Sequence, residues 1–69
     1  MKRFEVSYGI WSQLSQSAAP LKVSSVKVNA GDPREAEQVA VQQIKARDPH
    51  ALDRASQPVV RVYTILEVN

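Results

Sequence analysis

Residues 26–37, which read VKVNAGDPREAE, decide the fold, because an alternating strand pattern meets the start of a helix there. Gly31 can adopt backbone angles that other residues avoid, and the Asp32 side chain can accept backbone N–H groups as an N-cap. Pro33 suits the first helical turn, and Glu35 stands where a capping-box partner belongs. The stretch therefore predicts a strand-to-helix junction, but it indicates no chemistry.

The helix that begins at this junction is predicted to cover residues 33–46. The pair Asp48-Pro49 ends it, because proline removes an N–H donor and restricts the residue before it. The same pair can cap a short helical turn over residues 49–54, with Leu52 as its anchor to the core. Apolar residues at i, i+3 and i+4 spacing form one stripe along the main helix: Ala36, Val39, Ala40 and Ile44.

A strand is predicted before the junction at residues 2–11 and another after the helix at residues 59–68. The first alternates strictly, which is typical of a half-buried strand; its apolar residues are Phe4, Val6, Tyr8 and Ile10. Residues 12–20, which read SQLSQSAAP, predict a mobile loop. In the last strand the even positions are the more apolar and are expected to lie under the helix: Val60, Val62, Thr64, Leu66 and Val68.

The middle strand, residues 21–30, changes phase along its length. Leu21 and Val23 are apolar at odd positions, whereas the apolar residues from Val26 onward are at even ones. A β-bulge at Ser24-Ser25 would return both sets to one face, because one extra residue resets the alternation. The alternative is a strand that starts only at Ser25.

Together these elements predict one α+β domain over residues 1–69 with a ββαβ order. The helix lies on one face of a three-stranded mixed sheet, since a helical crossover makes the second and third strands parallel. The strand order 2-1-3 is favoured, with 1-2-3 as the alternative.

Composition bounds the class of protein. Sixty-nine residues, of which 43% are hydrophobic, indicate a single folded domain. No cysteine is present, and no run approaches the roughly 18 apolar residues of a membrane span. We therefore expect a cytoplasmic protein with no membrane association. The net charge of +2 is too small for the basic pI of 9.3 to indicate a nucleic-acid partner by itself.

No residue pattern predicts an enzyme, a metal site or a cofactor. His50 is the only histidine, and the serines lack a nucleophile-elbow pattern. Asp48, His50 and Asp53 are too few and of the wrong types for structural zinc. The helix N-terminus has one glycine where a phosphate loop needs several, and Asp32 would repel a phosphate there.

The sheet face away from the helix is the expected contact surface, because no second helix is available to cover it. Exposed apolar groups ringed by charge are typical of protein interfaces. The partner is expected to be another protein, either a host complex or a second copy. The alternative is a binder of RNA or single-stranded DNA, although Glu5 and Glu67 would dilute the positive charge. The expected contact residues are Trp11, Arg61, Tyr63, Ile65, Arg3 and Lys27.

The spacing of strand and helix residues resembles that of small phage- and plasmid-encoded accessory proteins. The shared pattern is V-x-V-x-A-x-D-x-x-E-A over residues 26–36, preceded by the 4–8 strand and followed by the 60–62 strand. This resemblance implies a mobile-element protein that binds and modulates a host complex, as anti-CRISPR proteins do. The positive net charge differs from that of acidic DNA mimics, so such a protein would act by docking.

Overall fold

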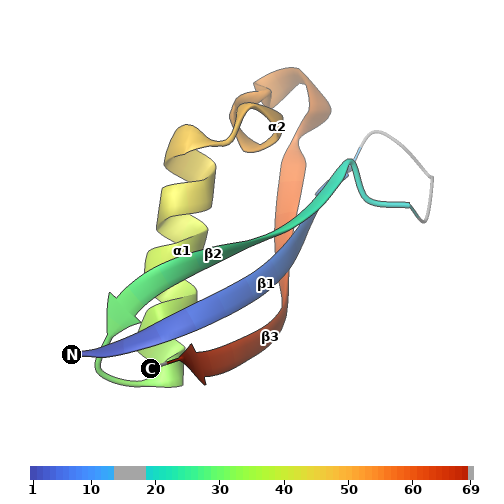
Figure 1. Cartoon of the computed structure of the whole chain (residues 1–69). Helices are drawn as coiled ribbons and strands as arrows, with labels where there is room; N and C mark the ends of the chain where they lie inside the picture. Colours follow the sequence, from blue (N-terminus) through green and yellow to red (C-terminus); the bar gives the residue numbers. More distant parts are fainter. Residues whose placement is uncertain (14–18, 69) are drawn as a thin grey trace.

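The computed structural model describes residues 1–13 and 19–68 (Figure 1). Its elements are, in order, β1 (Lys2–Ser12), β2 (Lys22–Ala30), α1 (Pro33–Arg47), α2 (Pro49–Leu52), the 3₁₀ helix η1 (Arg54–Ser56) and β3 (Pro58–Val68). Residues 14–18 of the predicted loop lie outside the described residues.

The three strands form one sheet in the order β2-β1-β3, as favoured from the sequence. Both pairings of the central strand β1 are antiparallel. The prediction of a mixed sheet is therefore wrong. The strands β2 and β3 do run in the same direction, but they never pair, because β1 lies between them.

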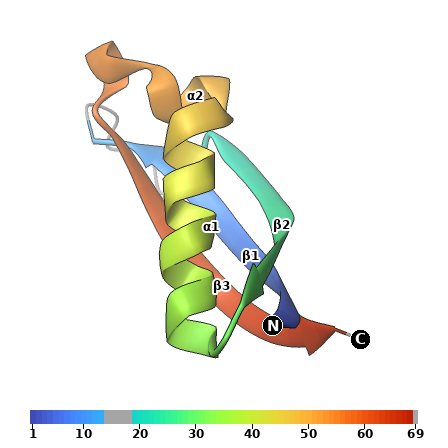
Figure 2. The same cartoon turned by 90° about the vertical axis from the view of Figure 1, so that its left-hand side faces the viewer.

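Helix α1 covers one face of the sheet (Figure 2). Its small residues Ala36 and Ala40 are fully buried against the strands, and Ile44 is buried one turn further on. The strand side of this core consists of the four predicted residues of β1 together with two from β2: Phe4, Val6, Tyr8, Ile10, Val28 and Ala30. We call the sheet face opposite α1 the open face.

The strand-to-helix junction has the predicted N-cap and first-turn proline, but Gly31 does not adopt a positive φ angle there. The Asp32 carboxylate accepts a hydrogen bond from the backbone N–H of Glu35 at 2.7 Å, and Pro33 occupies the first helical position. At the other end, α1 stops at Arg47, and the backbone N–H of Asp48 donates to the Ile44 carbonyl at 2.9 Å.

Strand β2 contains no bulge. Its pairing with β1 runs without a shift from Lys2 opposite Ala30 to Ile10 opposite Lys22. The predicted bulge at Ser24-Ser25 is wrong, and so is the alternative start at Ser25. Val23 lies opposite Gly9 on the open face and is 60% exposed. The phase change in the sequence thus marks a strand with apolar residues on both faces.

A β-bulge interrupts the pairing of β1 with β3, and it lies at Tyr63. Ser7 pairs with Thr64 and Tyr8 pairs with Val62, so Tyr63 is an extra residue with no partner in β1. Such a bulge reverses the facing of all residues beyond it. Val60 and Val62 therefore face the helix as predicted, whereas the prediction is wrong for Thr64, Leu66 and Val68. Ile65 takes their place and packs against the core.

The connection from α1 to β3 packs against the core through a different residue from the one predicted. The predicted turn at residues 49–54 is divided between α2 and η1. Leu52 is 52% exposed, so its predicted anchoring role is wrong. Its neighbour Ala51 packs instead against the core cluster around Ile10.

Candidate functional site

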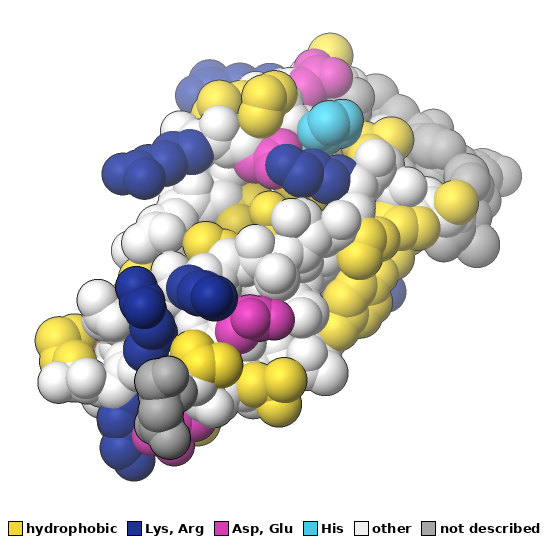
Figure 3. Space-filling model, viewed as in Figure 1, with side chains coloured by type: hydrophobic (Ala, Val, Ile, Leu, Met, Phe, Trp, Pro, Cys, Tyr) yellow, Lys and Arg dark blue, Asp and Glu magenta, His cyan; other side chains and the backbone are white. Residues whose placement is uncertain are grey.

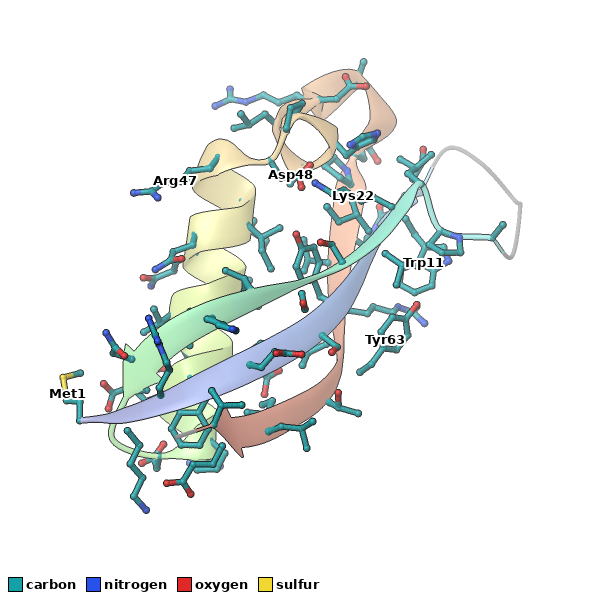
Figure 4. The ribbon with its side chains drawn as sticks, in the orientation of Figure 1. Met1, Trp11, Lys22, Arg47, Asp48 and Tyr63 are labelled. Atoms are coloured by element: carbon teal, nitrogen blue, oxygen red, sulfur yellow. The ribbon has the colours of Figure 1, made fainter. Side chains whose placement is uncertain are left out.

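Three of the predicted contact residues meet at one end of the open face. The rings of Trp11 and Tyr63 touch edge to face, with centroids 5.9 Å apart and planes 73° apart (Figure 4). The Arg61 guanidinium carbon lies 5.6 Å from the centre of the Trp11 ring, within the range of a cation–π contact. We call Trp11, Arg61 and Tyr63 the aromatic cluster.

Gly9 provides the space that the aromatic cluster occupies. It lies on β1 opposite both Val23 and Arg61. A Cβ atom at this position would come within 2.6 Å of Tyr63 Oη and 2.7 Å of Trp11 Cζ3. The φ angle of Gly9 is not positive, so the glycine is required for space and not for backbone conformation. The two rings shield a strand glycine that has no side chain of its own to pack.

The bulge lies at Tyr63, the third member of this cluster. In a regular strand alternate residues share a face, so Tyr63 would stand on the open face with Arg61 even without the bulge, and Ile65 would follow them there. The extra residue lets Arg61 and Tyr63 stand at the open face while Val62 and Ile65 both reach the core. The bulge thus turns Ile65 into the core and leaves Arg61 and Tyr63 on the open face.

Replacing Gly9 with alanine is expected to displace the rings and preserve the sheet. The clashing atoms are the outer ends of side chains, so rotation of the rings relieves the contact at a cost of about 1 kcal/mol. Trp11 is the only tryptophan, so its fluorescence and the near-ultraviolet circular dichroism report the displacement directly. The far-ultraviolet spectrum should remain that of the parent. Ser7→Ala on the same face is the matched control, and an unchanged Trp11 spectrum in Gly9→Ala would contradict this geometry.

Charge on the open face is concentrated away from the aromatic cluster. Arg3 lies on β1 between Asn29 and Val68, and Lys27 lies opposite Glu5. Glu67 was expected on this face, but it stands opposite Phe4 on the helix side, because it follows the bulge. Figure 3 shows the two zones, with hydrophobic side chains forming a continuous area at the right and Lys and Arg gathered at the lower left.

The predicted contact residues are thus divided by the structure. Trp11, Arg61 and Tyr63 are together, and Arg3 and Lys27 share their face at the far end. Ile65 is not on this face, and its prediction there is wrong because the bulge turns it inward. Sequence reasoning missed three exposed apolar residues, for which the phase changes in β2 and β3 were the available signal: Leu21, Val23 and Leu66.

A second polar arrangement links β2 to the end of α1. The Lys22 ammonium donates to Asp48 Oδ2 at 2.5 Å, although 26 residues separate them. The other carboxylate oxygen accepts the backbone N–H of His50 at 2.9 Å and so caps α2. The hydrogen bond from Lys22 holds the pKa of the buried Asp48 below its ordinary value. The same bond raises the pKa of Lys22.

The arrangement around Asp48 has a structural explanation. His50 Nδ1 lies 3.4 Å from Asp48 Oδ1, but this carboxylate is already engaged by Lys22 and by the cap of α2. Within residues 1–13 and 19–68, no three His, Cys, Asp or Glu side chains are grouped as a metal ion requires. Among the described helices, none has the length and apolar character needed to cross a membrane.

Comparison with known proteins assigns the chain to no family. The chain matches no protein-family model. No curated protein is significantly similar to it, and neither is any solved structure. The resemblance to small phage- and plasmid-encoded proteins therefore stays a prediction.

Proposed function

We propose that this protein is a non-enzymatic interaction module that binds another protein through the aromatic cluster. One observation carries the proposal: a tryptophan, a tyrosine and an arginine are gathered on a sheet face that no described helix covers. These three residue types most often dominate the binding energy of protein interfaces. The exposed side chain of Val23 lies opposite Gly9 and extends the apolar area to β2.

The charge of the open face favours a partner with acidic groups around an apolar centre. The cations Arg3, Lys27 and Arg61 share this face with one carboxylate, that of Glu5. A second copy docked by the same face would bring these cations together, and like charges across an interface are costly. The occupant is therefore a different protein. The resemblance to mobile-element proteins would make that partner part of a host complex, which this protein would modulate.

Binding of RNA or single-stranded DNA is the second candidate. The position of Glu67 on the helix side leaves the open face more positive than the sequence indicated, and this favours a nucleic acid. Base stacking, however, requires exposed ring faces. In this structure Arg61 lies over the Trp11 ring and the edge of one aromatic ring meets the other. The contacts within the cluster therefore favour a protein partner.

The proposal is tested with the double variant Arg61→Ala/Tyr63→Ala. A partner is captured from a host lysate, purified, and titrated against parent and variant while Trp11 fluorescence is followed. We expect the variant to bind at least ~10-fold more weakly, since hot-spot truncations cost about 2 kcal/mol or more. The control is Arg34→Ala/Gln38→Ala on the exposed side of α1, which should bind as the parent does.

Two results would overturn the assignment to a protein partner. The first is a purified partner that binds the double variant as tightly as the parent. The second is binding of a mixed-sequence single-stranded oligonucleotide that falls steeply with salt and is lost in the double variant, because each phosphate contact releases counterions. That second result would establish the nucleic-acid alternative.

A further inference from the structure

The two edge strands of the sheet, β2 and β3, differ in how well they are protected against pairing with another chain. Strand β3 begins with Pro58, which has no N–H to donate, and is interrupted by the bulge at Tyr63. Prolines and bulges are the usual protection of an edge strand against pairing with another chain. Strand β2 has neither: its nine residues contain no proline and keep one register with β1 throughout. Within the described part of the chain, β2 is the edge that remains open to an added strand.

A groove runs beside this same edge. Its volume is about 290 Å³, close to the lower limit of ~300 Å³ for ligand pockets. One wall comes from β2 and the other from the last turns of α1, with Tyr8 and Asp48 between them. The groove is lined by Lys22, Ser25 and Val26 on β2 and by Gln43, Ile44 and Arg47 on α1.

The charged side chains that line the groove favour an acidic ligand. No ion pair engages the exposed Arg47 guanidinium among the described residues. Lys22 gives one of its three donors to Asp48, and its side chain is 36% exposed. Figure 4 shows Lys22 beside Asp48, and Arg47 at the end of α1 with its side chain extending away from that pair. Because Lys22 and Asp48 neutralise each other, an incoming carboxylate meets Arg47 as the cation of the groove that no ion pair engages among the described residues.

We propose that an extended peptide segment with an acidic side chain adds as a fourth strand along β2. Its main chain would pair with the outer edge of β2, and alternate side chains would enter the groove. The carboxylate would take a bidentate bond from Arg47, a geometry that guanidinium favours. Val26 and Ile44 would contact the aliphatic part of that side chain. This site is separate from the aromatic cluster and does not depend on the function proposed for it.

The probe is the peptide acetyl-TVEVT-amide, titrated into ¹⁵N-labelled protein and compared with acetyl-TVQVT-amide. We expect amide shifts along β2 and at Arg47, and tighter binding of the glutamate peptide by about fivefold. In Arg47→Gln this preference should disappear. Arg54→Gln, a substitution of an exposed arginine outside the groove, should retain it.

Main-chain pairing is tested separately with two N-methylated peptides. In an added strand, alternate N–H groups point toward the neighbouring strand. One peptide is N-methylated at the two valines and the other at the central glutamate. Only one of these two peptides should therefore lose its pairing with β2. Any of four results would overturn the proposal. Two concern the peptides: equal binding of both methylated forms, or no amide shift at the highest soluble concentration. The other two concern the place and cause of the shifts: shifts confined to β3 or the open face, or shifts in β2 that depend on protein concentration without peptide.

Discussion

Replacement of Asp48 by alanine is expected to lower the free energy of unfolding by about 2 kcal/mol. The loss combines an N-cap, worth about 1 kcal/mol, with a charged hydrogen bond from Lys22 that partial exposure weakens to about the same size. A domain of this length has a total stability of roughly 3–10 kcal/mol. Denaturant unfolding followed by Trp11 fluorescence measures the change.

Asp48→Asn separates the two contributions. Asparagine caps a helix about as well as aspartate, so this variant should lose only the charge interaction, about half of the alanine effect. If the two variants are equally destabilised, the cap is not a separate contribution. If neither is destabilised, the link between β2 and α1 does not stabilise the fold.

The pH dependence follows from the pKa shifts of the pair. The pKa of Asp48 is lowered from 3.8, so its contribution is present above that value and is lost as pH falls through the lower folded pKa. The pKa of Lys22 is raised from 10.5, so its contribution is present below that value and is lost as pH rises through the higher folded pKa. In Asp48→Asn both of these pH-dependent losses should be absent, so the difference in stability between parent and variant should shrink as pH falls through the folded pKa of Asp48 and as it rises through that of Lys22.

Ala40→Leu is expected to destabilise the protein by about 2–3 kcal/mol, because it forces α1 away from the sheet. Ala40 and Ala36 have no exposed surface and lie directly against the strands. Extra methylene groups in a filled core must displace the backbone or strain the side chains.

The control for this substitution is Gln38→Leu. It adds a leucine to the exposed side of the same helix and should change the stability by less than ~0.5 kcal/mol. Thermal and denaturant unfolding of both variants measure the difference. Equal stabilities would show that the helix–sheet spacing tolerates a larger residue.

The parts of the fold that depend on local pattern could be predicted from the sequence. The N-cap of α1, its buried stripe and the alternation of β1 each follow from residues close together in the chain. The bulge at Tyr63 could not be predicted in this way. Apolar residues occupy both phases of β3, and alternation alone does not distinguish a bulge from a strand with two apolar faces.

The same ambiguity explains the error in β2, where the phase change did reflect two apolar faces. For the candidate site, the side-chain types at Trp11, Arg61 and Tyr63 were visible in the sequence, but their meeting depends on the pairing of β1 with β3 and on the space above Gly9. The contact between Lys22 and Asp48 joins distant segments that no short-range pattern connects.

The pairing of Arg3 with Val68 has a practical consequence for handling the molecule. The start of β1 and the end of β3 therefore lie at the same end of the molecule (Figure 1). Trp11 is eight residues further along β1, roughly 26 Å away at the rise of an extended strand. A surface anchor or a fluorescent label attached before β1 or after β3 would thus lie far from the aromatic cluster. A partner that binds the cluster should show the same affinity for both labelled forms.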